Sequence, residues 1–166
     1  MLILFLTLLS AIPGARGLTL EEAIKRCPVP YEIMWAIAKV ESGGYPFVIR
    51  VNENVRVRAP WLKPLGNGAY DCKNYRLCVY TARELIRRGI KNVDLGAFQI
   101  NYLYHRVSPE VAFSVPESYL KACSILLEKV KENGWSWEGI ASYHSKNPKR
   151  NREYAIKLYK ALQGLR

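Results

Sequence analysis

Four cysteines constrain the fold of this chain more than any other feature, because each disulfide they form would join two separate segments. They are Cys27, Cys72, Cys78 and Cys123 in a chain of 166 residues. An even number of cysteines in a small exported chain favours disulfides, and four cysteines allow three pairings. The short spacing of Cys72 and Cys78 suits a local cross-link, which leaves Cys27 and Cys123 to join the first helix to a late one.

The same residues do not have the spacing of a metal site. The chain has no Cys-x-x-Cys pair, and its two histidines, His105 and His144, lie 39 residues apart. Zinc sites usually draw their ligands from closely spaced pairs. We therefore expect neither a metal nor a cofactor.

The first seventeen residues have the composition of a secretory signal peptide. Residues 1–12 are almost entirely apolar, and Ala15 and Gly17 then provide the small residues of a cleavage site. The segment lacks the usual Lys or Arg before the apolar run, and an uncleaved anchor or a buried helix are the alternatives. We expect cleavage near Gly17, export to the periplasm or beyond, and one domain over residues 18–166.

The formal net charge of +11 favours an acidic polymer as the binding partner. Peptidoglycan, nucleic acid and anionic lipid would all satisfy this condition. The basic residues are scattered along the chain, without the aromatic and basic motifs of RNA-binding domains or the spacing of zinc fingers. We therefore expect no specific binding of nucleic acid.

Hydrophobic periodicity and capping signals predict a mainly α chain of the α+β class. We expect a short β-hairpin over residues 47–58 with its turn at 52–54, a loop over 59–77 and a compact turn over 94–101. Helices are expected over 19–27, 31–42, 78–88, 116–132, 136–144 and 149–163.

Glu41 is the first candidate for chemistry. It follows Ile37 by four residues and lies on the apolar face of its helix, where a charged carboxylate is costly to maintain. This environment suits a general acid at neutral pH. Gly43 and Gly44 leave backbone room for a ligand beside it. The alternative is an ordinary glutamate that points to water from the end of a helix.

The segment from Asp94 to Asn101 (DLGAFQIN) supplies further candidates. Asp94, Gln99 and Asn101 could face one cleft, and amide side chains both donate and accept hydrogen bonds, as sugar hydroxyl and N-acetyl groups require. The alternative is a turn whose amides are satisfied within the protein.

A third segment, ASYHSK from Ala141 to Lys146, follows Trp135 and Trp137. Tyr143 can donate a hydrogen bond and aromatic faces can stack on sugar rings, but a place in the core is the alternative, which we favour for Trp137. We expect a structural role for His144. Ser42 lies outside any G-x-S-x-G motif, which argues against a serine hydrolase.

These segments together resemble the lysozyme-like lytic transglycosylases (the SLT domain). The resemblance rests on Glu41-Ser42, on Asp94-x-Gly-x-x-Gln-Ile-Asn101, on Ala141-x-Tyr-His-Ser and on Tyr154-Ala155, and it runs from about Cys27 to Leu162. It is strongest for the VirB1-like branch, which serves conjugation and secretion systems, and it supports the pairing of Cys27 with Cys123. The chain departs from the family at Gly96-Ala97-Phe98-Gln99, where relatives often have Gly-Leu-Met-Gln.

The resemblance implies a lysozyme-like fold and cleavage of the β-1,4 bond between N-acetylmuramic acid and N-acetylglucosamine. Glu41 would act first as acid and then as base, which gives a 1,6-anhydro product. Ser42 and Gln99 would position Glu41 or the sugar, Asn101 would contact the substrate, and Tyr143 would orient it or stabilise the intermediate. The enzyme would act as a monomer on peptidoglycan, with a secretion or conjugation complex as its partner.

Two other functions remain open. The segment around Asp94 also resembles the one that carries the second carboxylate of animal-type lysozymes, so hydrolysis with Asp94 as that carboxylate is one alternative. A wall-binding module without catalysis is the other.

Overall fold

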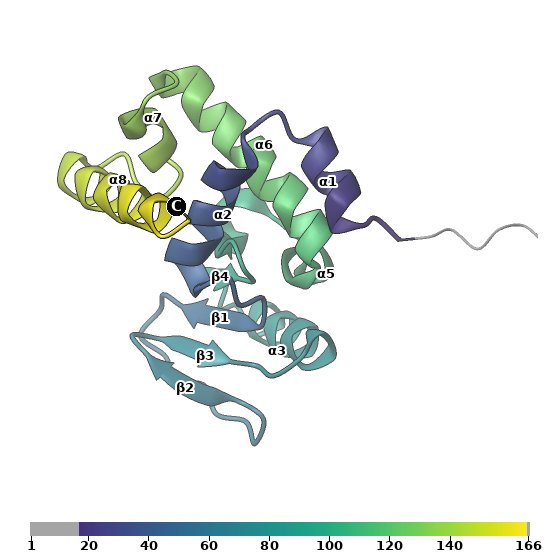
Figure 1. Cartoon of the computed structure of the whole chain (residues 1–166). Coiled ribbons are helices and arrows are strands. Elements are labelled where there is room, and N and C mark those ends of the chain that lie inside the picture. Colours follow the sequence, from purple (N-terminus) through teal and green to yellow (C-terminus); the bar gives the residue numbers. More distant parts are fainter. Residues whose placement is uncertain (1–16, 166) are drawn as a thin grey trace, which may run out of the picture.

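The structure is a computed structural model, and it describes residues 17–165 (Figure 1). Residues 1–16, which make up nearly all of the predicted signal peptide, lie outside the described residues. Helix accounts for 54% of the described residues and strand for 11%. The expected α+β class with mostly helical content is therefore confirmed.

The helical part surrounds a central helix, α2, which lies between α1, α6 and α8 in Figure 1. The expected capping box is present at the start of α1, where the side chains of Thr19 and Glu22 each accept a backbone hydrogen bond of the other. The helices of this part are α1 (Leu20–Arg26), α2 (Tyr31–Ser42), α6 (Val115–Asn133), α7 (Trp137–Ala141) and α8 (Pro148–Gln163).

The other part is a five-stranded antiparallel sheet of order β2-β3-β1-β4-β5. Helix α3 (Tyr75–Arg87) packs against β1, and the short α4 (Tyr102–His105) and α5 (Pro109–Phe113) follow the sheet. The strands are β1 (Val48–Val51), β2 (Lys63–Gly66), β3 (Ala69–Asp71), β4 (Val93–Leu95) and β5 (Ile100–Asn101).

The predicted hairpin over residues 47–58 is wrong. Only its first half is a strand, and β1 pairs with β3 on one side and β4 on the other, so that Ile49 lies opposite Tyr70 and Leu95. These distant partners bury Ile49 to 1% exposure, whereas Val55 in the supposed second strand is 42% exposed. Burial against distant strands therefore decided the pairing.

Other boundaries also differ from expectation. The predicted loop over 59–77 contains the β2–β3 hairpin, and the predicted turn over 94–101 contains the ends of β4 and β5. Helix α3 begins at Tyr75, earlier than expected, because the Asn74 side chain caps it by accepting from the amide of Leu77. Helix α7 ends at Ala141, three residues earlier than expected, and α4 and α5 were not predicted.

Two disulfides are present, with the pairing that the spacing favoured. Cys27–Cys123 joins the end of α1 to the middle of α6, and Cys72–Cys78 joins the end of β3 to α3. All four cysteines are buried in a hydrophobic cluster that continues from the helical part into the sheet. Disulfides of this kind are typical of exported proteins.

Every helix among residues 17–165 is too short or too polar to cross a bilayer.

Candidate active site

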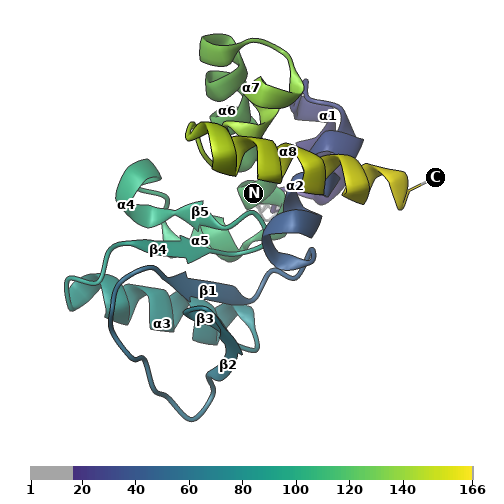
Figure 2. The ribbon, with the colours of Figure 1, turned by 90° about the vertical axis from the view of Figure 1, so that its left-hand side faces the viewer.

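A cleft of about 810 Å³ lies between the helical part and the sheet. In Figure 2, α8 crosses above β5 and β4, with α4 on the left and the end of α2 on the right. The volume of the cleft is within the range of ligand-binding clefts. The polar and charged residues that line it include Glu41, Arg50, Asn52, Asp94, Gln99, Asn101, Tyr104, His105, Lys129, Tyr143, His144, Lys146, Arg150, Glu153, Tyr154 and Lys157.

Glu41 lies in the last turn of α2, at the centre of this lining. The helix ends at once because Gly43 adopts a left-handed conformation (φ 70°) and its amide bonds back to the carbonyls of Ala38 and Lys39. Ile37, one turn earlier, is fully buried, and the Glu41 side chain is only 13% exposed. The carboxyl group is therefore held at the inner edge of the cleft, as the apolar stripe predicted.

Tyr154, on α8, fixes the orientation of this carboxyl group. Its hydroxyl donates a 2.7 Å hydrogen bond to Glu41 Oε1. Burial, together with the nearby Glu41 charge, raises the pKa of Tyr154 well above its ordinary value, so the hydroxyl keeps its proton. Because Oε1 accepts this bond, Oε2 is the oxygen left to carry and transfer a proton.

His144 lies beside the same pair of residues. Its ring stacks on that of Tyr154 with centroids 4.7 Å apart and planes 8° apart, and its Nδ1 is 3.8 Å from Glu41 Oε1. That distance is too long for a hydrogen bond. His144 therefore supports the ring that orients Glu41, which is consistent with the structural role expected for it.

Ser42 forms its hydrogen bonds with the backbone. Its hydroxyl donates to the backbone carbonyls of Ala97 (2.7 Å) and Ala38 (3.2 Å), and the residue lies outside the cleft lining. Because Ser42 lies outside the lining and its one hydrogen is engaged by the backbone, its placement fits the expected role of positioning Glu41 better than contact with a sugar. Ser42 ties the end of α2 to the turn that carries Gln99.

Gln99 is buried in the cleft wall. Its Nε2 donates to the carbonyls of Gly96 (2.9 Å) and Val48 (3.3 Å), which holds the residue in a left-handed conformation (φ 46°). Its Oε1 accepts no hydrogen bond from any residue that the structure describes. A buried acceptor without a donor is costly, so this oxygen is suited to accept from a ligand.

The turn before Gln99 requires glycine at position 96. Gly96 has φ +76°, and a Cβ there would lie 2.0 Å from the carbonyl oxygen of Ala112. The turn can therefore pack directly on α5 only without a side chain at this position.

Asp94 and Asn101 form part of an amide network on the sheet side of the cleft. Asp94 Oδ1 accepts from Asn101 (2.8 Å) and Oδ2 accepts from Asn52 (2.7 Å). Burial raises the pKa of Asp94, the two amides oppose that shift, and the charge of Glu41 adds to it. Asn101 also donates to Asn92 and caps α4, so its amide is used within the protein.

Tyr143 contributes its ring to the cleft, while its hydroxyl donates to the carbonyl of Phe98 (2.8 Å). This bond joins the segment after α7 to the turn that bears Gln99. Burial raises the pKa of Tyr143 well above its ordinary value, and the charges of Glu41 and Asp94 act in the same direction. Tyr143 thus remains a neutral hydroxyl.

Tyr154, Asn52 and Tyr104 are among the cleft residues for which the sequence predicted no role. Tyr154 was noted only as part of a motif, although its place with Asn151 and Leu158 on the buried face of α8 was a usable signal. Asn52 was assigned to a hairpin turn, and Tyr104, 73% exposed, belongs to the unpredicted α4.

The tryptophans do not line this cleft. Trp135 and Trp137 are 57% and 42% exposed and border a separate groove with Ile33 and Leu165. The expectation that Trp137 belongs to the core is therefore wrong.

No group of three or more His, Cys, Asp or Glu side chains that could hold a metal ion occurs within residues 17–165. Neither protein-family models nor curated proteins nor solved structures match this chain. Its function is therefore inferred from the residues and geometry of the cleft.

The bond from Tyr154 to Glu41 gives a first prediction. Tyr154→Phe is expected to lower the activity that depends on Glu41 about tenfold, because a hydrogen bond to a charged group contributes about 1.5–3 kcal/mol. Tyr159→Phe on the exposed face of α8 is the matched control. The rate and the melting temperature of both variants check this, and an unchanged rate for Tyr154→Phe would refute the assigned role.

Proposed function

We propose that this protein is an exported peptidoglycan lytic transglycosylase with a lysozyme-like fold. The observation that carries the proposal is a single, nearly buried glutamate, Glu41, which a neutral tyrosine orients in a cleft large enough for a sugar chain. The two disulfides and the apolar N-terminal segment support export. A cleft between a helical part and a small antiparallel sheet supports the fold assignment.

In the proposed reaction, Oε2 of Glu41 gives its proton to the glycosidic oxygen as the bond from that oxygen to the muramoyl anomeric carbon breaks. The resulting carboxylate then takes the proton of the C6 hydroxyl of the same sugar. The hydroxyl oxygen closes on the anomeric carbon, so the 1,6-anhydro ring forms without consuming water. The N-acetyl group of the substrate can stabilise the positive charge, and one protein carboxylate is then sufficient.

The remaining cleft residues suit a sugar substrate. Gln99 Oε1 is a buried acceptor in the cleft wall, without a partner among the described residues, that a hydroxyl or N-acetyl N–H could satisfy, and the exposed side chain of Tyr104 offers a face for a pyranose ring. Tyr143 and Ser42 would act indirectly, by holding the Gln99 turn against the helices. Asn101 would act indirectly too, by fixing Asp94.

Hydrolysis with Asp94 as a second carboxylate is the competing reaction, since Asp94 lies in the same cleft as Glu41. The hydrogen bonds of Asp94 favour a structural role, because an amide engages each of its oxygens. Asp94→Asn is therefore expected to retain wall-lytic activity within about tenfold, whereas a catalytic carboxylate would cost far more. Lysis rates of purified wall by the variant decide this, and a loss of about a thousandfold would support hydrolysis.

The direct test of enzymatic activity is the clearing of purified peptidoglycan by the protein. Progressive clearing that depends on Glu41 supports the enzyme. Binding to the wall without clearing would instead identify a wall-binding module. A secretion or conjugation complex is the proposed partner of the protein. Pull-down from cells that carry such a system tests this proposal.

A further inference from the structure

The helical wall of the cleft carries a group of cations that the proposed reaction does not use. This cationic wall consists of Lys129 on α6, Lys146 before α8, and Arg150 and Lys157 on α8. Three acidic residues line the same cleft: Glu41 at the end of α2, Asp94 on β4, and Glu153, which lies on α8 beside the cations. Glu41 and Asp94 are partly buried, whereas Lys146, Arg150 and Lys157 are exposed, so the exposed part of the helical wall is mainly cationic.

Most of these cations are not neutralised within the described part of the chain. Lys146 forms an ion pair with Glu132 at 2.6 Å. Glu153 stands three residues after Arg150 and four before Lys157, a spacing at which helix ion pairs form, yet neither pair occurs among the described residues. Arg150 and Lys157 are therefore available to a ligand.

One of these cations, Arg150, lies where the helix itself disfavours a positive charge. The first turn of α8 contains no acidic residue and includes Lys149 and Arg150. Positive side chains near the positive end of a helix are unfavourable unless an anion is nearby. An anion bound to the wall would offset this unfavourable interaction.

At the other end of the same wall, Lys129 lies close enough to His105 to act on it electrostatically. Burial lowers the pKa of His105, and the charges of Lys129 and Lys121 lower it further. His105 and Lys129 both line the cleft. The cationic character therefore extends from α8 to α6.

Resting on the proposed function, we propose that the cationic wall binds the carboxylates of the peptides attached to the muramoyl residues, so that the protein prefers peptide-bearing glycan. The sugar backbone of the glycan is neutral, so it can lie against Glu41 and Asp94 without charge repulsion. The acidic peptides attached to it can meet the cationic wall. Arg150 and Lys157 are separated by about 10 Å along α8, so they can meet charges on one branch or on neighbouring branches. A polyphosphate such as DNA fits less well, because it would bring phosphate against Glu41 and Asp94.

The test measures binding separately from catalysis, in Glu41→Gln protein. Calorimetry gives the Kd of a peptide-bearing muramoyl tetrasaccharide and of a neutral N-acetylglucosamine tetrasaccharide. We expect Lys129→Gln, Arg150→Gln and Lys157→Gln together to weaken binding of the acidic glycan about tenfold and of the neutral glycan less than twofold. The acidic glycan alone should also bind more weakly as salt concentration rises.

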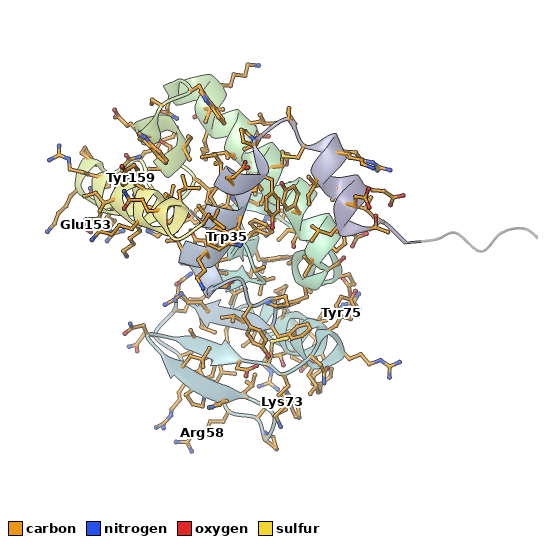
Figure 3. The ribbon with its side chains drawn as sticks, in the orientation of Figure 1. Trp35, Arg58, Lys73, Tyr75, Glu153 and Tyr159 are labelled. Carbon is orange, nitrogen blue, oxygen red and sulfur yellow. A yellow bond between two sulfur atoms is a disulfide. The ribbon has the colours of Figure 1, made fainter. Side chains whose placement is uncertain are left out.

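The control removes the same net charge elsewhere, with Arg58→Gln, Lys63→Gln and Arg76→Gln. Figure 3 shows Arg58 in the sheet part, far from Glu153 on α8. An equal loss in both triple variants, or no loss in either, would overturn the proposal. Parallel wall clearing by the protein with Glu41 intact keeps the outcomes separate, because failure to clear would count against the enzyme and not against the anion site.

Discussion

Replacing Glu41 with Gln is expected to reduce clearing of purified peptidoglycan about a thousandfold. General acid or base catalysis contributes about 10²–10⁴-fold, and here one residue would perform both steps. Gln has the shape of the protonated acid and can still accept the hydrogen bond of Tyr154, but it cannot give up a proton. The fold and the binding of glycan should therefore persist while the reaction stops.

The measurement is the initial rate of turbidity loss, with a melting curve for each protein. Glu128→Gln makes the same chemical change at an exposed position on α6 and serves as the control. The enzyme proposal predicts normal clearing by the control and equal melting temperatures for all three proteins. Equal clearing by Glu41→Gln and unmodified protein would exclude Glu41 as the catalytic acid.

Removing the disulfide between Cys27 and Cys123 is expected to have the largest effect on stability. Its cysteines are 96 residues apart, so chain entropy assigns about 4–5 kcal/mol to the cross-link. For a chain of this size the double change to Ala should lower the melting temperature by about 10–15 °C. The bond also fastens α1 to α6, which flanks the cleft, so loss of the bond should loosen the helical part.

The second disulfide provides the matched control. Cys72 and Cys78 are only six residues apart and are equally buried, and their replacement with Ala should cost about 2–2.5 kcal/mol. Thermal unfolding of both double variants under oxidising conditions gives the comparison. If the Cys72–Cys78 variant were the less stable of the two, loop length would not explain the stabilisation.

Local signals in the sequence predicted the helices well and the sheet poorly. The capping box at Thr19 and the stripe that ends at Glu41 act within one helix, so their outcome depends little on distant contacts. The partners of Ile49 are Tyr70 and Leu95, and pairing over such distances depends on the packed core. Alternation in residues 47–58 therefore predicted a hairpin that the fold does not form.

The candidate site was predicted in part for a similar reason. Glu41, Asp94, Gln99, Asn101 and Tyr143 do line one cleft, because the segments that carry them meet between the helical part and the sheet. The sequence did not predict the hydrogen-bond partners of these residues. Ser42 and Asn101 form hydrogen bonds within the protein, and Tyr154 donates to Glu41, from which it is separated by 113 positions of sequence. A residue type indicates what a side chain can do, and the fold determines which partner it meets.

The central claim is that Glu41 acts alone and that cleavage consumes no water. Mass spectrometry of the fragments released from purified peptidoglycan tests it most directly, with the reaction run in isotopically labelled water. The account predicts 1,6-anhydromuramoyl ends that are lighter than reducing ends by one water and free of the label. Reducing ends that carry labelled oxygen would contradict it and would indicate a hydrolase.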